Sequence, residues 1–168
     1  MTMRTTVRAP LILVALGLLV TACGTGRTMV MESPVEKKTF TAVTLERAAD
    51  TVEVPDQYRQ QFVQNVRERL YGTSEKPGPF TEGAGLTVRI KVIQFDAGNQ
   101  FERWFWGGIG NAGEGSLQVL AEFFEGQTKL ANIQTEGRIG SGFFGGSMSE
   151  AVDKAAEEIA EYAIANFR

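Results

Sequence analysis

The sequence predicts an α+β fold, in which a mostly antiparallel sheet of about four strands carries two helices packed on one face. Two periodicities predict it. Apolar residues recur at every second position in three segments and at helical spacing in two others. The predicted order is strand, helix, strand, strand, strand, helix, and such an order gives a two-layer domain. We assign this single domain to residues 39–168.

Each predicted helix carries one apolar stripe. The first runs from Pro55 to Tyr71, and Pro55 suits the first turn of a helix because proline lacks the N–H that would be unpaired there. The second runs from Ser147 to Phe167, and Ser147 with Glu150 forms a capping box. The second stripe is rich in alanine, which implies a close approach to the sheet. The stripe residues are Tyr58, Phe62, Val66 and Leu70 in the first helix, and Val152, Ala155, Ala156, Ile159 and Ala163 in the second.

Four segments have the composition or the alternation of β-strands. They are Thr39–Glu46, Gly85–Asp96, Ser116–Glu125 and Leu130–Ile139. In the second of these, Ile93 and Phe95 break the alternation, which indicates a bulge or a strand end. Gly126 and Gln127 make a short turn between the third and the fourth, so these two strands are predicted to form a hairpin.

The N-terminus has the three zones of a secretory signal peptide. Arg4 and Arg8 make its start basic, residues 11–20 are uncharged and apolar, and two small residues precede Cys23. The apolar run is about half of the ~20 residues that a transmembrane helix needs. We therefore expect residues 1–22 to be a signal peptide rather than a retained span.

Residues 20–23, Val-Thr-Ala-Cys, resemble a lipobox, the processing sequence of bacterial lipoproteins. The thiol of Cys23 would accept the lipid, and it belongs to the only cysteine in the chain. The alternative is an ordinary signal peptide followed by a chance cysteine. Gly24 stands where inner-membrane retention usually shows an aspartate, so we expect an anchor in the outer membrane with the domain facing the periplasm. Residues 24–38 are polar and contain Pro34, and we interpret residues 23–38 as the lipidated cysteine and a flexible tether.

The charge of the chain argues against several classes of partner. Loss of Arg4 and Arg8 with the signal peptide takes the net charge from −3 to −5. Nucleic-acid binding needs a basic surface, so we expect no nucleic acid among the partners. A membrane partner is expected through lipid on Cys23 instead.

The residue types argue against most catalytic sites. The chain has no histidine, which removes Ser-His-Asp and Cys-His catalysis and most zinc sites. Carboxylates remain for acid–base chemistry, but clusters such as Glu157, Glu158 and Glu161 lie on the polar face of a predicted helix, where a solvated surface is the common case. We therefore expect no enzymatic activity, no catalytic or metal-binding residues and no cofactor.

The pattern G-x-G-x-x-G occurs at Gly108–Gly113 and is typical of dinucleotide binding. That use requires a helix directly after the glycines, because the helix N-terminus binds the pyrophosphate. Here a strand follows. We interpret the glycines as a connection between strands and expect no dinucleotide.

Aromatic residues gather next to these glycines and in a second glycine-rich segment at residues 140–146. One interpretation is that the rings cover the sheet edge or cap the core. The other is an exposed patch that contacts a partner protein or a lipid, because tryptophan combines apolar area with a polar N–H. The candidate contact residues are Phe101, Arg103, Trp104, Phe105, Trp106, Phe143 and Phe144.

The order of these motifs resembles the DUF4410 family of bacterial lipoproteins. The resemblance covers the lipobox, residues 94–99 (QFDAGN), Arg103, the glycines of residues 107–110, the strand Leu117–Phe124 and the alanine-rich last helix. The turn at residues 124–127 departs from the family's usual D-x-x-T-G. The resemblance implies a small periplasmic α+β domain and supplies no catalytic residues.

Three functions remain open from the sequence. The leading hypothesis is a lipid-anchored, non-enzymatic interaction module that assists cell-envelope assembly or transport through an envelope protein partner. The second is a carrier or sensor of a lipid-like apolar ligand. The third and weakest is a hydrolase that uses carboxylates.

Overall fold

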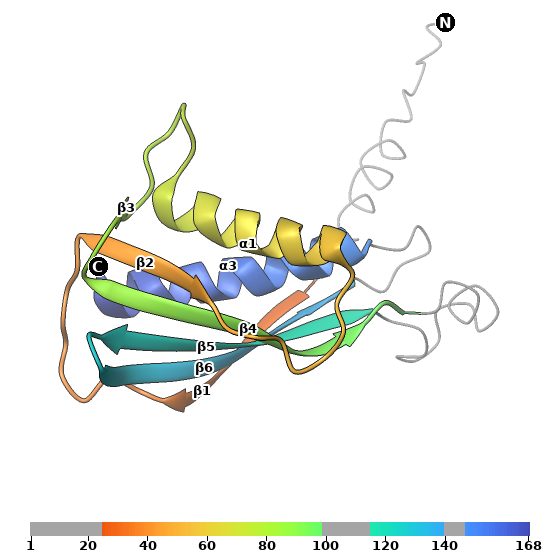
Figure 1. Ribbon diagram of the computed structural model, residues 1–168, viewed down its shortest axis with the longest axis horizontal. Coiled ribbons are helices and arrows are strands. Elements are labelled where there is room, and N and C mark those ends of the chain that lie inside the picture. The colour runs from red at the N-terminus through yellow and green to blue at the C-terminus, as the bar shows by residue number, and fades with distance from the viewer. Residues whose placement is uncertain (1–24, 99–114, 140–146) are drawn as a thin grey trace, which may run out of the picture.

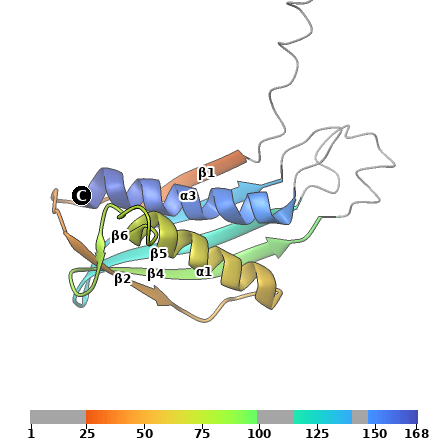
Figure 2. The same ribbon diagram turned by 90° about the horizontal axis from the view of Figure 1, so that it is seen from above.

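The computed structural model describes residues 25–98, 115–139 and 147–168. A six-stranded sheet has the order β1-β6-β5-β4-β2-β3, and both helices cover the same face of it (Figures 1 and 2). The fold is α+β, as the sequence predicts. The elements are β1 Thr25–Glu32, β2 Ala42–Arg47, α1 Asp56–Tyr71, β3 Thr81–Glu82, β4 Leu86–Asp96, β5 Ser116–Glu125, β6 Thr128–Arg138 and α3 Met148–Phe167.

The sheet is antiparallel in its larger part. β1 pairs with β6, β6 with β5, and β5 with β4, all antiparallel, whereas β2 is parallel to both β4 and β3. The parallel pair follows from the chain path, because α1 carries the chain from one end of β2 back to the start of β4, as parallel neighbours require.

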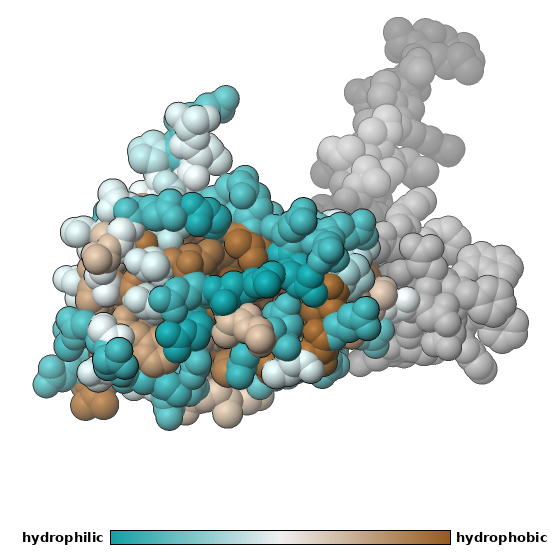
Figure 3. Space-filling view, viewed as in Figure 1, coloured by the Kyte–Doolittle hydropathy of each residue, from teal (hydrophilic) through white to brown (hydrophobic). Residues whose placement is uncertain are grey.

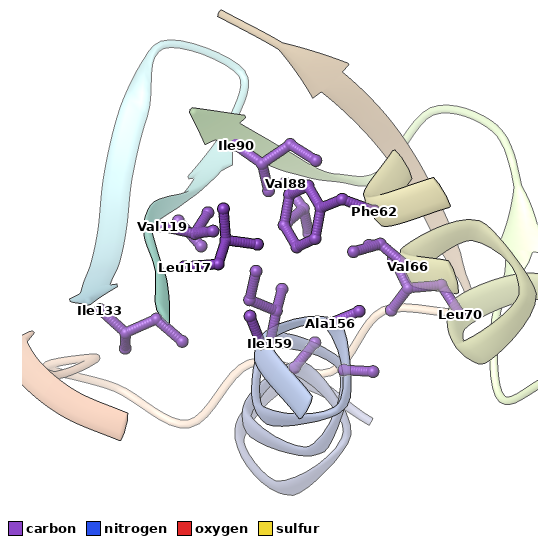
Figure 4. Close-up of a cluster of buried hydrophobic side chains, with 14 of the residues drawn as sticks. Phe62, Val66, Leu70, Val88, Ile90, Leu117, Val119, Ile133, Ala156 and Ile159 are labelled. Atoms are coloured by element: carbon purple, nitrogen blue, oxygen red, sulfur yellow. The ribbon is translucent and has the colours of Figure 1, made fainter. Parts of the chain in front are cut away.

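The core lies between the helices and the sheet. In Figure 4, Phe62, Val66 and Leu70 from α1 meet strand residues such as Val88 and Leu117, with Ile159 of α3 beside them. All of these side chains are at most 2% exposed. The predicted stripes of both helices therefore face the sheet, although Tyr58 is only partly buried.

Alanine and glycine bring α3 very close to β6. The Oγ1 atom of Thr135 lies 3.5 Å from the carbonyl oxygen of Ala155, within the range of a weak hydrogen bond. A Cβ atom added to Gly137 would stand 1.8 Å from the carbonyl oxygen of Ala151. Only glycine fits at position 137, so this close approach depends on a single residue of the sheet.

The bulge and the hairpin are confirmed. The pairing of β4 with β5 shifts between Val92 and Gln94, which leaves Ile93 as the extra residue. After the shift Phe95 returns to the helix side, where its ring centroid lies 5.7 Å from that of Tyr58. Gly126 has φ of 59° in the turn between β5 and β6, a left-handed conformation that glycine adopts at little cost.

The prediction of a flexible tether is wrong for residues 25–32, and the sheet has six strands rather than about four. Thr25–Glu32 forms β1, an edge strand that is bonded to β6 along its length. Its side chains are mostly exposed, so burial imposes no apolar alternation that the sequence could display. β3 has two residues, too few for any periodic pattern.

A strand start and a helix cap also differ from the prediction. The strand expected from Thr39 begins at Ala42. Ser147 does take the N-cap position of α3, but its side chain makes no capping hydrogen bond. The Glu150 N–H instead donates to the Ser147 carbonyl oxygen at 3.0 Å, so the predicted capping box is not formed.

We expect Gly137→Ala to lower the free energy of unfolding by at least about 2 kcal/mol, because the new methyl group forces α3 away from β6. Urea denaturation monitored by circular dichroism measures this change. The matched control is Gly126→Asn, which faces open space and keeps a residue tolerant of positive φ, so its effect should stay within about 1 kcal/mol. Equal stability of the two variants would contradict the close-approach argument.

Candidate functional site

The residues that the sequence selects as candidate contacts lie outside the described residues, and so does the glycine pattern of residues 108–113. The same holds for Cys23. These candidate contacts are Phe101, Arg103, Trp104, Phe105, Trp106, Phe143 and Phe144. The structure does describe the positions from which their segments leave the sheet.

Four strands meet at one end of the sheet, which we call the loop end. It is defined by Thr25, Asp96, Ser116 and Arg138, which are paired across β1, β6, β5 and β4. Asp96 ends β4, Ser116 begins β5 and Arg138 ends β6, while Thr25 begins β1. A hydrogen bond of 2.9 Å from the Ile139 N–H to the Gly115 carbonyl oxygen continues the pairing past β6. Segments 99–114 and 140–146 and the chain before Thr25 are therefore all attached at the loop end.

The next row of the sheet carries a polar cluster on the face that the helices leave open. Arg27, Glu136, Gln118 and Gln94 stand in register across four strands. The Glu136 carboxylate is at the centre, although its residue is only 6% exposed. We call Arg27, Gln118, Glu136 and Arg138 the Glu136 cluster.

Three side chains bind the Glu136 carboxylate through a hydrogen bond and ion pairs. The Nε2 atom of Gln118 donates to Oε1 at 3.1 Å, and Nη2 of Arg138 lies 3.1 Å from the same oxygen. Nη2 of Arg27 lies 3.6 Å from Oε2. The Nε2 atom of Gln134 donates in turn to the Gln118 side-chain oxygen at 2.8 Å, which fixes the orientation of that amide.

Burial acts to raise the pKa of Glu136, but the hydrogen bonds from Arg138 and Gln118 and the charges of Arg138 and Arg27 outweigh it. The pKa of this carboxyl therefore lies below its ordinary value. A carboxylate held ionised in this way is a poor proton donor at neutral pH. The cluster suits fixed charge recognition or stability better than acid–base chemistry.

Further along the same face, one cation stacks on an aromatic ring. The guanidinium carbon of Arg89 lies 4.7 Å from the centroid of the Phe124 ring. Its Nη2 atom also donates to Glu46 at 2.9 Å. The arginine thus covers apolar area and leaves little of the ring available to a ligand.

A groove of about 460 Å³ lies on the other side of the molecule, between the end of α1 and α3. Four carboxylates and two cations line it: Glu68, Asp153, Glu157, Glu161, Arg69 and Lys76. Nη2 of Arg69 donates to Asp153 at 2.7 Å across the two helices. Pro77, Pro79, Ala160 and Ile164 also line it, so the groove combines charged and apolar surface.

Sequence reasoning missed the Glu136 cluster for one reason. Gln134, Glu136 and Arg138 are placed on the polar face of their strand by alternation alone, but Arg27 falls in the segment interpreted as a tether. The residue that completes the cluster therefore lies in a segment whose sequence predicts no strand. A buried glutamate between two arginines has no local sequence signal.

Membrane-spanning helices and metal clusters are both absent from the described part of the chain. No helix in residues 25–98, 115–139 or 147–168 is long and apolar enough to cross a membrane. Within the same ranges, no group of three or more acidic or cysteine side chains is arranged to hold a metal ion.

We expect Glu136→Gln to lower the free energy of unfolding at neutral pH by about 1–3 kcal/mol, because both arginines lose their counter-charge. The pKa of Glu136 is lower in the folded than in the unfolded protein. Its stabilisation is therefore present above the unfolded value and is lost as pH falls through the folded value. Urea denaturation from pH 7 downward should show a shallower acid-side loss of stability for Glu136→Gln than for the unchanged protein.

The control for this prediction is Glu161→Gln, an exposed carboxylate on α3, which should leave the pH profile of stability unchanged. Superimposable profiles for Glu136→Gln and the unchanged protein would show that the cluster contributes nothing to stability.

The comparisons with known proteins find distant similarity among solved structures, and no curated protein matches the chain. The chain is similar to a PelC dodecamer from Paraburkholderia phytofirmans, with 12% identity and a TM-score of 0.44, over 86% of this chain and 99% of that one. It is also similar to a Xanthomonas campestris protein of the DUF330 family, with 9% identity and a TM-score of 0.43, over 81% and 88% of the two chains.

One family model, described as a domain of unknown function, matches residues 30–142. This range runs from the second half of β1 through the β5–β6 hairpin, so it contains most of the sheet. The chain belongs to the DUF4410 family.

Proposed function

We propose that this protein is a lipid-anchored periplasmic interaction module that assists cell-envelope assembly or transport and has no enzymatic activity. The observation that carries the proposal is the pairing of Thr25 with Arg138 at the loop end. Cys23 precedes Thr25 by two residues, which allows about 7 Å of chain. A lipid on Cys23 would therefore hold the loop end close to a membrane.

The pairing of β1 with β6 supports a contact made at the membrane. A flexible spacer of about fifteen residues would let the domain work up to about 50 Å from the bilayer. Since β1 begins at Thr25 and is bonded to β6, little free chain separates the lipid from the sheet. Segments 99–114 and 140–146 start from the same end, and together they hold all the candidate contact residues, both tryptophans among them. We propose that they contact an envelope protein at the membrane surface.

The chemistry of the helix-free face of the sheet supports the proposed lack of enzymatic activity. The most buried carboxylate there, Glu136, is held ionised by arginines and an amide. Such a group fixes charge rather than exchanging protons during a reaction.

The anchor is tested with Cys23→Ser. We expect this variant to lose incorporation of labelled palmitate and to move from the membrane fraction to the soluble fraction, because no acceptor thiol remains. The control is Thr21→Ser, which keeps a small residue before the cut. Membrane association and labelling that persist in Cys23→Ser would overturn the lipid anchor.

The contact is tested with Trp104→Ala together with Trp106→Ala. We expect in-cell crosslinking followed by mass spectrometry to lose a reproducible envelope protein, because truncating central aromatic residues commonly costs about 2 kcal/mol or more of binding, roughly thirtyfold. The control is Ile164→Ala, an exposed apolar residue on α3. If the double variant retains its partner, the contact lies elsewhere. Copurifying lipid without a protein partner would favour the carrier function.

A further inference from the structure

We propose that β1 is a docking edge for the β1 strand of a second copy of this chain, paired antiparallel so that one sheet continues into the next. The proposal concerns a surface of described residues and does not depend on the lipid anchor or on the proposed function. It begins from the position of β1, which is the outermost strand on one side of the sheet.

Within the part of the chain that the structure describes, the free side of β1 offers a long unpaired row of backbone groups. The strand has eight residues and is bonded on one side to β6, whereas the strand at the opposite edge, β3, has only two. Natural edge strands are commonly protected by lysine, proline or very short length. Residues 25–32 contain neither lysine nor proline, and the only irregularity is the register shift between Val30 and Glu32.

Exposed apolar side chains concentrate on this edge. Met29, Val30 and Met31 are 49%, 47% and 57% exposed, and Val35 is wholly exposed. Across the described residues only one other large apolar side chain, Ile164, is comparably open. In Figure 3 tan and brown atoms lie along the lower margin, where Figure 1 shows β1 and the chain that follows it. Covering these side chains would remove apolar area from water.

The order of charges on β1 fits a reversed copy of itself. Arg27, Met29 and Glu32 share the helix-free face, since they pair with Glu136, Gln134 and Asn132 of β6. Along the strand this face carries a cation, then the apolar Met29, then an anion. An antiparallel copy presents the same order reversed, so Arg27 of each copy comes near Glu32 of the other and the two Met29 side chains meet in the middle. A parallel copy would bring like charges together, which is unfavourable.

The pairing also fixes the distance between the two anchors. An eight-residue strand is about 26 Å long, and the two Thr25 residues would stand roughly 30 Å apart at opposite ends of the paired strands. Both chains can then be tied to one membrane only if β1 lies along its surface.

The test uses the full chain in cells, with Met29→Cys added to the natural Cys23. Cross-strand neighbours near the middle of the paired strands have Cβ atoms about 5 Å apart, within reach of a disulfide. We expect mild oxidant to give a disulfide dimer of this chain, identified by mass spectrometry as a link between the cysteines introduced at position 29 of the two copies. The unchanged chain, which shows what Cys23 alone gives, and Gln60→Cys, exposed on α1, should give at least about tenfold less dimer.

A second variant separates pairing from folding. Met29→Lys places like charges side by side at the centre of the pair, and its partly exposed position lets the monomer fold. We expect it to abolish the dimer of detergent-solubilised protein in analytical ultracentrifugation while its melting temperature stays within a few degrees. A monomeric unchanged protein, a dimer unaffected by Met29→Lys, or a crosslink from the introduced cysteine to a different protein would each overturn the proposal.

Discussion

The closeness of α3 to β6 is the constraint on which the rest of the structure depends. The backbone of Gly137 lies against Ala151, and Ala155 sits over Thr135, so the helix is held almost on the sheet. Because this packing buries one face of β6, its other face must carry the polar residues, Glu136 among them. The same packing lets α3 reach past β6 to β1, where Glu158 accepts a hydrogen bond from the Thr28 hydroxyl. One close helix therefore supports the core, the polar cluster and the edge strand.

The parts of the fold that burial dictates could be predicted from the sequence. The stripe of α1 and the alternation of β4 up to Val92 follow from which side chains leave water, and both are present. The hairpin follows from the glycine turn at Gly126, and it is present too. β1 could not be predicted, because its residues gain backbone pairing with β6 rather than burial, and backbone pairing is nearly independent of side-chain type. The capping box failed for a related reason: Ser147 is a favourable N-cap residue, but nothing in the local sequence fixes its hydroxyl where it would bond the first turn of the helix.

The candidate site also has one part that the sequence predicts and another that it does not. Composition selects aromatic residues in segments 99–114 and 140–146, and strand order brings the starts of both segments to the loop end. The Glu136 cluster, in contrast, depends on register across three strands, since Arg27 lies far from Glu136 along the chain. Only the pairing of β1 with β6 joins them. Pairing between residues far apart in the sequence does not change the local hydrophobic periodicity. The Glu136 cluster therefore could not be predicted from the sequence and is visible only in the structure.

Two consequences of β1 constrain each other. Its first residue ties the chain's N-terminal segment to the loop end, and we propose that its free side pairs with a second copy. Antiparallel pairing places two loop ends at opposite extremes of one extended sheet, so a lipid on each copy would hold that sheet along the membrane and keep both loop ends beside the bilayer. If the strands of the paired sheet stood perpendicular to the membrane, only one of the two lipid anchors could reach it. The edge pairing and the lipid anchor that we propose would therefore be compatible in a single orientation, with both loop ends at the membrane surface.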